Sequence, residues 1–99
     1  MAAFFCKLIP PRPTFAQDMS EAEAKIMGEH AAYWHDLLIQ GRAVTFGLVA
    51  DPAGAYGIGV VDVDGEPAVR HLTENDPTIL SRSGFRFEVY PMPFGAARP

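Results

Sequence analysis

Residues 20–41 read SEAEAKIMGEHAAYWHDLLIQG and carry the strongest helix signal in this 99-residue chain. Ser20 and Glu23 form a Ser-x-x-Glu capping box, and Gly41 is a typical residue just past the end of a helix. Between them, apolar side chains recur at the spacing of an amphipathic helix. A helix is therefore predicted from Ser20 to Gln40, with an apolar face formed by Ile26, Met27, Ala31, Tyr33, Trp34, Leu37 and Leu38.

Four short runs rich in Phe, Leu, Val, Ile and Tyr surround this helix and predict β-strands. Residues 10–13 hold three prolines, which deny backbone donors to a sheet, so a stiff loop is expected there. Residues 51–54 read DPAG, a tight-turn composition that predicts a hairpin between the second and third strands. A loose tail is expected over residues 93–99. The four strands are expected at residues 3–9, 43–50, 55–63 and 85–92.

A second, shorter helix is expected between the third and fourth strands. It begins at residues 64–65, has Pro67 in its first turn, and stops at residues 75–76. The pair Asp76-Pro77 then starts a single further turn, because Asp is a favoured N-cap and the residue before proline avoids helical geometry. Gly84 closes this turn.

The resulting order, β-α-β-β-α-β, is the split βαβ pattern of an α+β, ferredoxin-like fold. In this fold two helices cover one face of a four-stranded antiparallel sheet, and the other face is left bare. Along the third strand neither side is plainly polar, since Ile58 and Val60 lie on one side and Val61 on the other. We therefore expect a second copy of the chain to cover the bare face, which gives a homodimer.

Composition and charge exclude several classes of partner. At 99 residues the chain is expected to be one domain, residues 1–99, and its 48% hydrophobic content is too apolar for a disordered chain. A net charge of −4 offers no positive field for nucleic acid. The apolar N-terminal run stops at Lys7, too early for a signal peptide or a membrane span. The single cysteine, Cys6, excludes an intramolecular disulfide, so a cytoplasmic location is expected.

His30 is the first candidate for chemistry, because its imidazole lies within the apolar stripe of the long helix. Such a group must find a polar partner or lose its charge, so it is either a hydrogen-bonded core residue or a functional one. Asp76 is the candidate partner, since the end of the second helix and the first half of the long helix can lie at the same rim of the sheet. Asp76 can also cap the turn that follows it, and the two roles can coexist.

Other residues give weaker signals. The aromatic side chains of Tyr33, Trp34 and Phe46 could stack on a planar ligand beside His30, but aromatics at helical spacing are more often core residues. Ser81 follows Asp76 closely enough to line the same pocket. His35 and His71 are expected at the surface, and the three histidines lack the spacing of a metal site, so neither a metal nor a cofactor is expected.

Three segments together resemble the YCII-related domain family. They are HAAYW at residues 30–34, the turn between Gly47 and Gly54, and NDPT at residues 75–78, and the resemblance covers nearly the whole chain. It implies the fold of the dimeric α+β barrels, with dimerisation through the exposed sheet face. It also implies a His–Asp catalytic pair at His30 and Asp76, and an activity on aromatic catabolites by elimination or dehalogenation. The stiff proline segment and a second helix interrupted by Pro67 depart from the family pattern.

Two functions remain open from the sequence. In the first, the chain is a cofactor-independent acid–base enzyme in which Asp76 orients His30. His30 then moves a proton on a small organic, possibly aromatic, substrate in an elimination, isomerisation or hydrolysis. In the second, the chain is a non-catalytic dimeric module that binds a small ligand or a protein partner, and the His30–Asp76 pair is structural.

Overall fold

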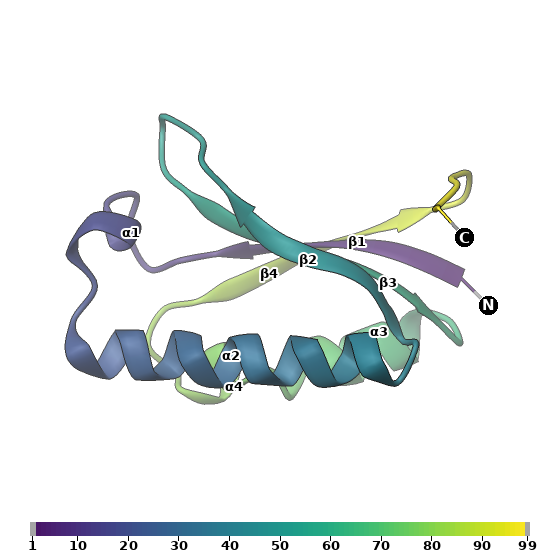
Figure 1. Ribbon diagram of the computed structural model, residues 1–99, viewed down its shortest axis with the longest axis horizontal. Coiled ribbons are helices and arrows are strands. Elements are labelled where there is room, and N and C mark those ends of the chain that lie inside the picture. Colours follow the sequence, from purple (N-terminus) through teal and green to yellow (C-terminus); the bar gives the residue numbers. More distant parts are fainter. Residues whose placement is uncertain (1, 99) are drawn as a thin grey trace.

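The computed structural model describes residues 2–98, which form a four-stranded antiparallel sheet with helices on one face (Figure 1). Neighbouring strands in the order β2-β3-β1-β4 are hydrogen-bonded, so β2 and β4 are the edges. This arrangement confirms the ferredoxin-like α+β fold. The elements are β1 (Ala2–Ile9), α1 (Phe15–Asp18), α2 (Glu21–Ile39), β2 (Ala43–Val49), β3 (Tyr56–Val63), α3 (Glu66–Glu74), α4 (Pro77–Leu80) and β4 (Arg86–Met92).

The core lies between the sheet and α2 and α3. Alternate residues of a strand point to opposite faces, and in β1 every second side chain from Phe4 onward is buried. Trp34 of α2 is 1% exposed and packs over Gly59 of β3. The main cluster consists of Phe4, Cys6, Trp34, Leu37, Ala43, Val61, Val63, Val69 and Leu72.

The predicted capping box begins α2 as expected. Ser20 Oγ accepts a hydrogen bond from the backbone N–H of Glu23 at 3.1 Å, and Glu23 Oε1 accepts one from the backbone N–H of Ser20 at 2.9 Å. These two bonds satisfy donors that the first turn of a helix leaves free. Gly41, with φ of 76°, ends the helix in the left-handed conformation that glycine adopts without strain.

The proline-rich segment, residues 10–13, forms no helix or strand, as expected for a stiff loop, and it leads into the short helix α1, which was not expected. Phe15 at the start of α1 is 4% exposed and packs edge-on against Phe85, with ring centroids 5.2 Å apart. Proline restricts φ but does not prevent a helix from starting after it. A stiff proline segment can therefore be followed by a short helix whose side chain, Phe15, packs in the core. Together with Leu8, these two aromatic residues form a second, smaller core cluster.

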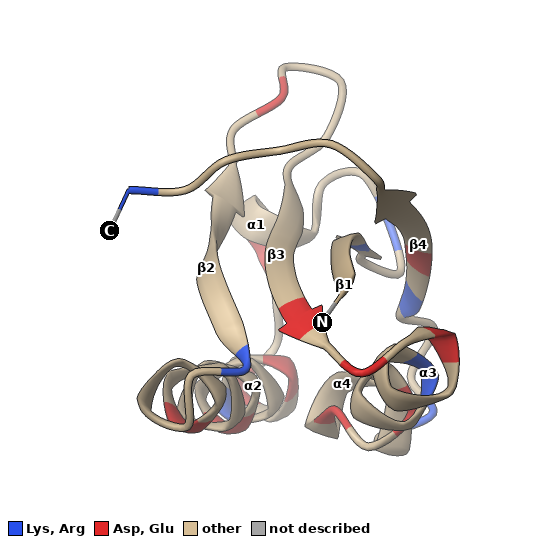
Figure 2. Ribbon diagram, turned by 90° about the vertical axis from the view of Figure 1, so that its right-hand side faces the viewer, with Lys and Arg blue, Asp and Glu red and all other residues tan. Residues whose placement is uncertain are grey.

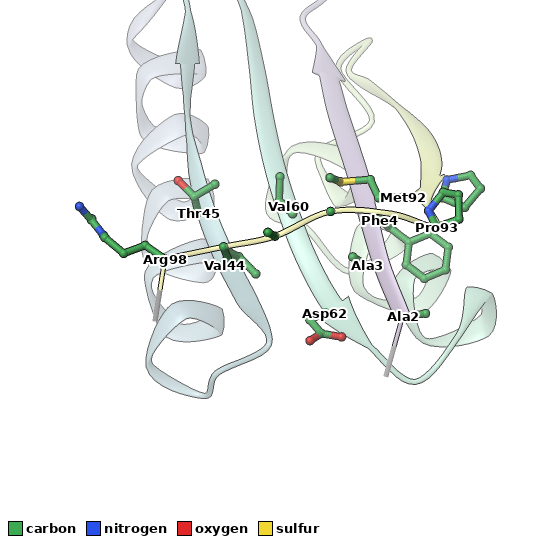
Figure 3. Close-up of a pocket in the computed structure, with 14 residues that line it drawn as sticks. Ala2, Ala3, Phe4, Val44, Thr45, Val60, Asp62, Met92, Pro93 and Arg98 are labelled. Carbon is green, nitrogen blue, oxygen red and sulfur yellow. The ribbon is translucent and has the colours of Figure 1, made fainter.

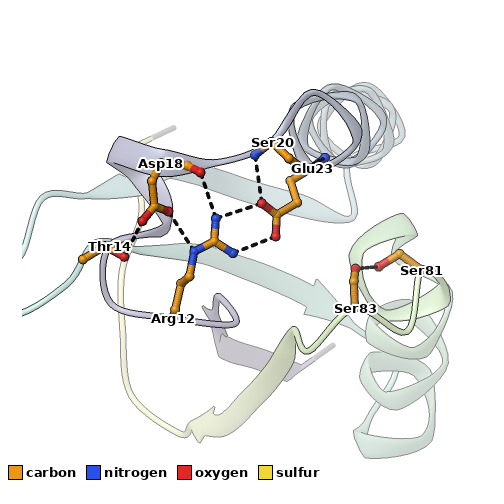
Figure 4. Close-up of polar contacts among 7 residues, drawn as sticks. All are labelled: Arg12, Thr14, Asp18, Ser20, Glu23, Ser81 and Ser83. Carbon is orange, nitrogen blue, oxygen red and sulfur yellow. Dashed lines mark hydrogen bonds and ion pairs between the residues drawn. The ribbon is translucent and has the colours of Figure 1, made fainter.

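Arg12 ties this segment to the start of α2 (Figure 4). Its guanidinium donates to Asp18 Oδ1 at 2.7 Å and to the backbone oxygen of Asp18 at 3.0 Å. It also donates to both carboxylate oxygens of Glu23, at 2.8 and 2.9 Å. Hydrogen bonds from Arg12 and from the Ser20 backbone hold the pKa of Glu23 at about 2. The capping box and the proline segment therefore share one carboxylate.

We expect Arg12→Gln to lower the melting temperature by a few degrees near neutral pH. Because the pKa of Glu23 lies below its usual value of 4.5, the stabilisation is complete above that pH and is lost as the pH falls toward 2. Thermal unfolding followed by circular dichroism across this range measures the effect. Arg70→Gln, which removes an exposed pair with Glu66, is the control and should change little. A pH-independent loss would mean that the carboxylates are not involved.

Pro67 does not interrupt α3. The helix begins at Glu66, and Pro67 occupies its first turn, where a missing backbone N–H leaves no hydrogen bond unmade. Gly65, at the N-cap, has φ of 90°. The expected interruption by Pro67 is therefore absent, and the helix is short, with nine residues.

The outer face of the sheet, away from the helices, is mixed: apolar side chains lie beside the charged strand residues Lys7, Asp62, Arg86 and Glu88. In Figure 2 the acidic and basic residues lie mostly on helices and loops, and the strands carry few of them. Residues 93–98 form no helix or strand and cross this face beyond β4 (Figures 2 and 3), while residue 99 of the expected tail lies outside the described residues. A cavity of about 910 Å³ lies between this crossing segment and the sheet, lined by residues that include Ala3, Val44, Val60, Met92 and Arg98.

Candidate functional site

Asp76 lies at the junction between α3 and α4 and caps α4. Its Oδ1 accepts hydrogen bonds from the backbone N–H of Thr78 at 2.9 Å and from Thr78 Oγ1 at 2.8 Å. Asp76 and Thr78 are both 0% exposed. The expected N-cap role is therefore present, and it anchors the carboxylate in a fixed orientation inside the protein.

The same carboxylate accepts a hydrogen bond from His30 on α2. His30 Nδ1 lies 2.8 Å from Asp76 Oδ2 and 3.1 Å from Oδ1. The two residues meet because α4 packs against α2, which brings positions 46 apart in the sequence together. Capping and contact with the histidine thus coexist in one side chain.

A third donor reaches Asp76 from the core. Trp34, one turn after His30 on α2, donates from its indole Nε1 to Asp76 Oδ2 at 2.7 Å. Burial alone raises the pKa of Asp76, but the hydrogen bonds from His30, Thr78 and Trp34 outweigh it and lower the pKa below its usual value. The carboxylate is therefore ionised at neutral pH and acts only as an acceptor.

An ionised Asp76 decides the tautomer of His30. Because the carboxylate can only accept, His30 Nδ1 must carry a hydrogen, and in the neutral imidazole Nε2 then holds the free lone pair. Within residues 2–98, every fully buried side-chain N or O atom has a hydrogen-bond partner. All hydrogen bonds of the His30 side chain run through Nδ1, so Nε2 is not fully buried, and the side chain is 12% exposed. Nε2 is therefore partly exposed and makes no hydrogen bond within the described part of the chain.

The other predicted ligand-binding residues lie around this pair in different ways. Trp34 is 1% exposed, so its ring faces belong to the core, and its ring centroid lies 6.1 Å from that of Phe46. Tyr33 donates from its hydroxyl to the backbone oxygen of Leu72 at 2.7 Å, which joins α2 to α3. Ser81 donates to the backbone oxygen of Thr78 at 2.6 Å and also contacts Ser83 (Figure 4). Phe46 and Ser81 are half-buried.

The remaining candidates lie apart from His30. His35 and His71 are exposed, and the edge of the His35 ring contacts Phe46 at 5.0 Å between centroids. Burial raises the pKa of the Cys6 thiol to about 12, which makes it a poor nucleophile. Among residues 2–98, no three His, Cys, Asp or Glu side chains are grouped closely enough to hold a metal ion.

Two contacts of this site escape sequence reasoning. The indole donor of Trp34 and the hydroxyl of Thr78 both bind Asp76, although Trp34 belongs to the apolar face of α2 and Thr78 lies outside any periodic pattern. The one available signal is the order Asp-Pro-Thr, since a capping Asp accepts from the residue two positions later.

Comparison with known proteins adds one finding. A family model described as YCII-related domain matches residues 3–93. A search of curated proteins found no match. Within residues 2–98, no helix has the length and apolar character needed to cross a lipid bilayer.

Proposed function

Since the chain belongs to the YCII-related domain family, we propose that it is a small acid–base enzyme that uses His30 to move a proton on an organic substrate. One observation supports this most: a fully buried, ionised Asp76 holds Nδ1 of His30 and leaves Nε2 free. Such a carboxylate fixes the tautomer of a general base and stabilises the imidazolium that forms. The reaction is an elimination, isomerisation or hydrolysis, and it needs no cofactor.

The proposed step is simple in chemical terms. Nε2 of neutral His30 removes a proton from the substrate, and the resulting imidazolium is stabilised by Asp76 at 2.8 Å. His30 then returns the proton to the product or to the leaving group, so the enzyme ends as it began. Trp34 and Thr78 hold the carboxylate through both halves of the cycle, which makes them positioning residues. Phe46 and Ser81 are proposed to contact the substrate.

The test is turnover of a panel of small aromatic acids, phenols and ring lactones, with products detected by mass spectrometry. We expect His30→Ala to lower turnover of any substrate found by about 10²–10⁴-fold, the usual contribution of general acid–base catalysis. His71→Ala, an exposed histidine on α3, is the matched control and should retain full activity. Equal turnover in wild type and His30→Ala would refute the proposed role.

A second candidate function follows from the burial of the same pair. Asp76 caps α4 and binds Trp34, so the His30–Asp76 contact could serve stability in a non-catalytic module that binds a small ligand or a protein. In that case variants of either residue change stability and no chemistry is lost. Measuring unfolding and turnover on the same variants separates the two functions.

We further propose that the protein is a homodimer joined through the outer sheet face. The support is an apolar strip across the two central strands and β4. Phe5 of β1 lies with its ring centroid 6.4 Å from that of Tyr90, and Tyr90 is 51% exposed. Ile58 of β3 extends the strip along the face away from α2, and Val60 beside it lines the cavity beneath residues 93–98. Apolar side chains gathered on one face are typical of an interface.

We expect Ile58→Asp to convert the dimer into a monomer, because a symmetric interface would bury the new charge twice. Light scattering after size exclusion should give a mass near 10.8 kDa instead of twice that value. Leu48→Asp is the control, since Leu48 is 69% exposed and lies off this strip. If wild type itself runs as a monomer, or Ile58→Asp stays a dimer, this face is not the interface.

A cytoplasmic location is proposed as well. Cys6 is a free, buried thiol within the described residues, and a free thiol persists best in a reducing compartment.

A further inference from the structure

A second cavity, of about 430 Å³, lies at the end of β1 between the proline segment and the β2–β3 hairpin. Its volume is within the range of pockets that hold small molecules. Lys7 and Tyr56 alternate with inward-facing residues of their strands, so they face the outer side of the sheet, opposite α2 and His30. The cavity is therefore separate from the His30–Asp76 site, and the inference drawn from it does not rest on the proposed acid–base function. It lies at one end of the outer face, where Lys7 is directly opposite Ile58 of the proposed dimer interface.

The walls of this cavity are held in place from two sides. A Cβ on Gly54 would meet Pro13 atoms at 3.1 Å, and a Cβ on Gly84 would meet Pro11 at 3.1 Å. Both glycines also have positive φ, of 144° and 97°, which residues with a side chain rarely adopt. The two turns therefore require glycine, and its lack of a side chain lets them lie close to the prolines. Arg12, which also lines the cavity, holds the proline segment through its hydrogen bonds to Asp18 and to Glu23 of α2. A cavity with such walls is formed before a ligand arrives, which lowers the entropic cost of binding.

The charges that line the cavity leave one cation without a partner. Arg12 is paired with Asp18 and Glu23. Asp51, the acidic residue of the lining, accepts from the backbone N–H of Ala53 at 2.8 Å and makes no ion pair among residues 2–98. Lys7 makes no ion pair among residues 2–98, although its Nζ lies 4.4 Å from the centroid of the Tyr56 ring. The aromatic ring fixes the ammonium group by a cation–π contact and leaves its donors available.

Glu88 on β4 is the nearest carboxylate in the strand register, directly opposite Lys7. It already accepts from Arg86 Nη1 at 2.9 Å and from the Tyr90 hydroxyl at 3.2 Å. Arg86 therefore occupies Glu88, and the ammonium group of Lys7 keeps its donors for a ligand. One available ammonium group suits one carboxylate.

We propose that this cavity binds a small organic monocarboxylate, with its carboxylate on Lys7 and its apolar body against Ile9 and the prolines. The charge selects the carboxylate, and the ring and side-chain surfaces of the proline segment select an organic body over an inorganic anion. Ile9, Pro10, Pro11, Pro13, Ala53 and Ala55 supply the apolar lining.

Benzoate is the probe, titrated into the ¹⁵N-labelled protein in the oligomeric state that it adopts. We expect saturable amide shifts at Lys7, Gly54, Tyr56 and Gly84. Lys7→Gln should weaken binding at least about tenfold, as loss of a charge-assisted hydrogen bond does. Lys7→Arg, which keeps the charge, should still bind.

Two controls make the result specific. Lys25→Gln removes the one other lysine of the chain, on the exposed side of α2, and should bind benzoate as wild type does. Benzamide has the shape of benzoate without its charge and should not bind. The proposal is overturned if benzoate gives no saturable shifts at these amides, if Lys7→Gln and wild type bind equally, or if benzamide matches benzoate. The amide spectrum of each variant also shows whether it is folded.

Discussion

Gly59→Ala should destabilise the protein by about 2–6 kcal/mol. A Cβ at this position would lie 2.4 Å from both Cη2 and Cζ3 of Trp34, far inside van der Waals contact. Overpacking of a core costs about 1–3 kcal/mol. The ring has little room to move, since its Nε1 is bonded to Asp76 at 2.7 Å, and losing that buried bond adds about 1–3 kcal/mol.

Urea unfolding followed by tryptophan fluorescence measures this cost, because Trp34 is the single tryptophan. Gly57→Ala is the matched control, two residues earlier on the same strand and face, where a Cβ would meet Leu8 at an ordinary 3.4 Å. We expect Gly57→Ala to be neutral or slightly stabilising, because alanine restricts the unfolded chain more than glycine does. Equal midpoints for the two variants would show that Trp34 does not press on Gly59.

The parts of the fold that could be predicted from sequence are those with local signals. The capping box at Ser20 and the helical period that follows act within one element, and α2 forms where they indicate. The strand pattern and the DPAG turn likewise specify the hairpin, in which Gly54 N–H donates to the Asp51 backbone oxygen at 2.9 Å. The helix α1 was not predicted, since Phe15 is held by a distant ring, Phe85, that no local pattern reveals.

The candidate site was predictable only in part, for a related reason. His30 stands out because an imidazole in an apolar stripe needs a partner, and Asp76 stands out before a proline. Their contact at 2.8 Å depends on how α4 packs on α2. The fold topology allows this packing but does not require it, so the sequence alone does not predict the contact. Trp34 was predicted as a stacking or core residue, and its position is in the core. Its bond to Asp76 was unforeseen, because an indole can bury its ring and still use its N–H.

These contacts make Asp76 the point where α2, α4 and the core meet. Its two oxygens accept from four donor groups: the imidazole of His30, the indole of Trp34, and the backbone N–H and hydroxyl of Thr78. A change at this position therefore acts on stability and on the state of His30 together. Separating the two effects requires two different substitutions.

Asp76→Ala should cost about 3–5 kcal/mol, the usual loss when one member of a buried, charge-assisted network is removed. The donors on His30, Trp34 and Thr78 would lose their acceptor. Asp76 is 0% exposed, so water does not replace the lost carboxylate at low cost. Because the pKa of Asp76 is lowered, its contribution is present above the usual value of 3.8 and disappears as the pH falls below that value. Wild type and Asp76→Ala should therefore converge in stability in acid, which thermal unfolding across that range would show.

Asp76→Asn separates the catalytic proposal from the structural one. The amide keeps the shape of the side chain but replaces one acceptor oxygen with an NH₂ donor. With its oxygen on Thr78, that NH₂ faces both His30 Nδ1 and the indole N–H of Trp34, so the hydrogen bond from Trp34 is lost. His30 Nδ1 must then accept, and the hydrogen of the neutral imidazole moves to Nε2. Long-range ¹H–¹⁵N spectra report this tautomer directly. We expect Nδ1–H in wild type and Nε2–H in the variant, with turnover lost even where the variant remains folded, because Nε2 no longer holds the lone pair that accepts the proton. A variant that changes tautomer and stability but keeps any turnover found for wild type would assign the pair a structural role.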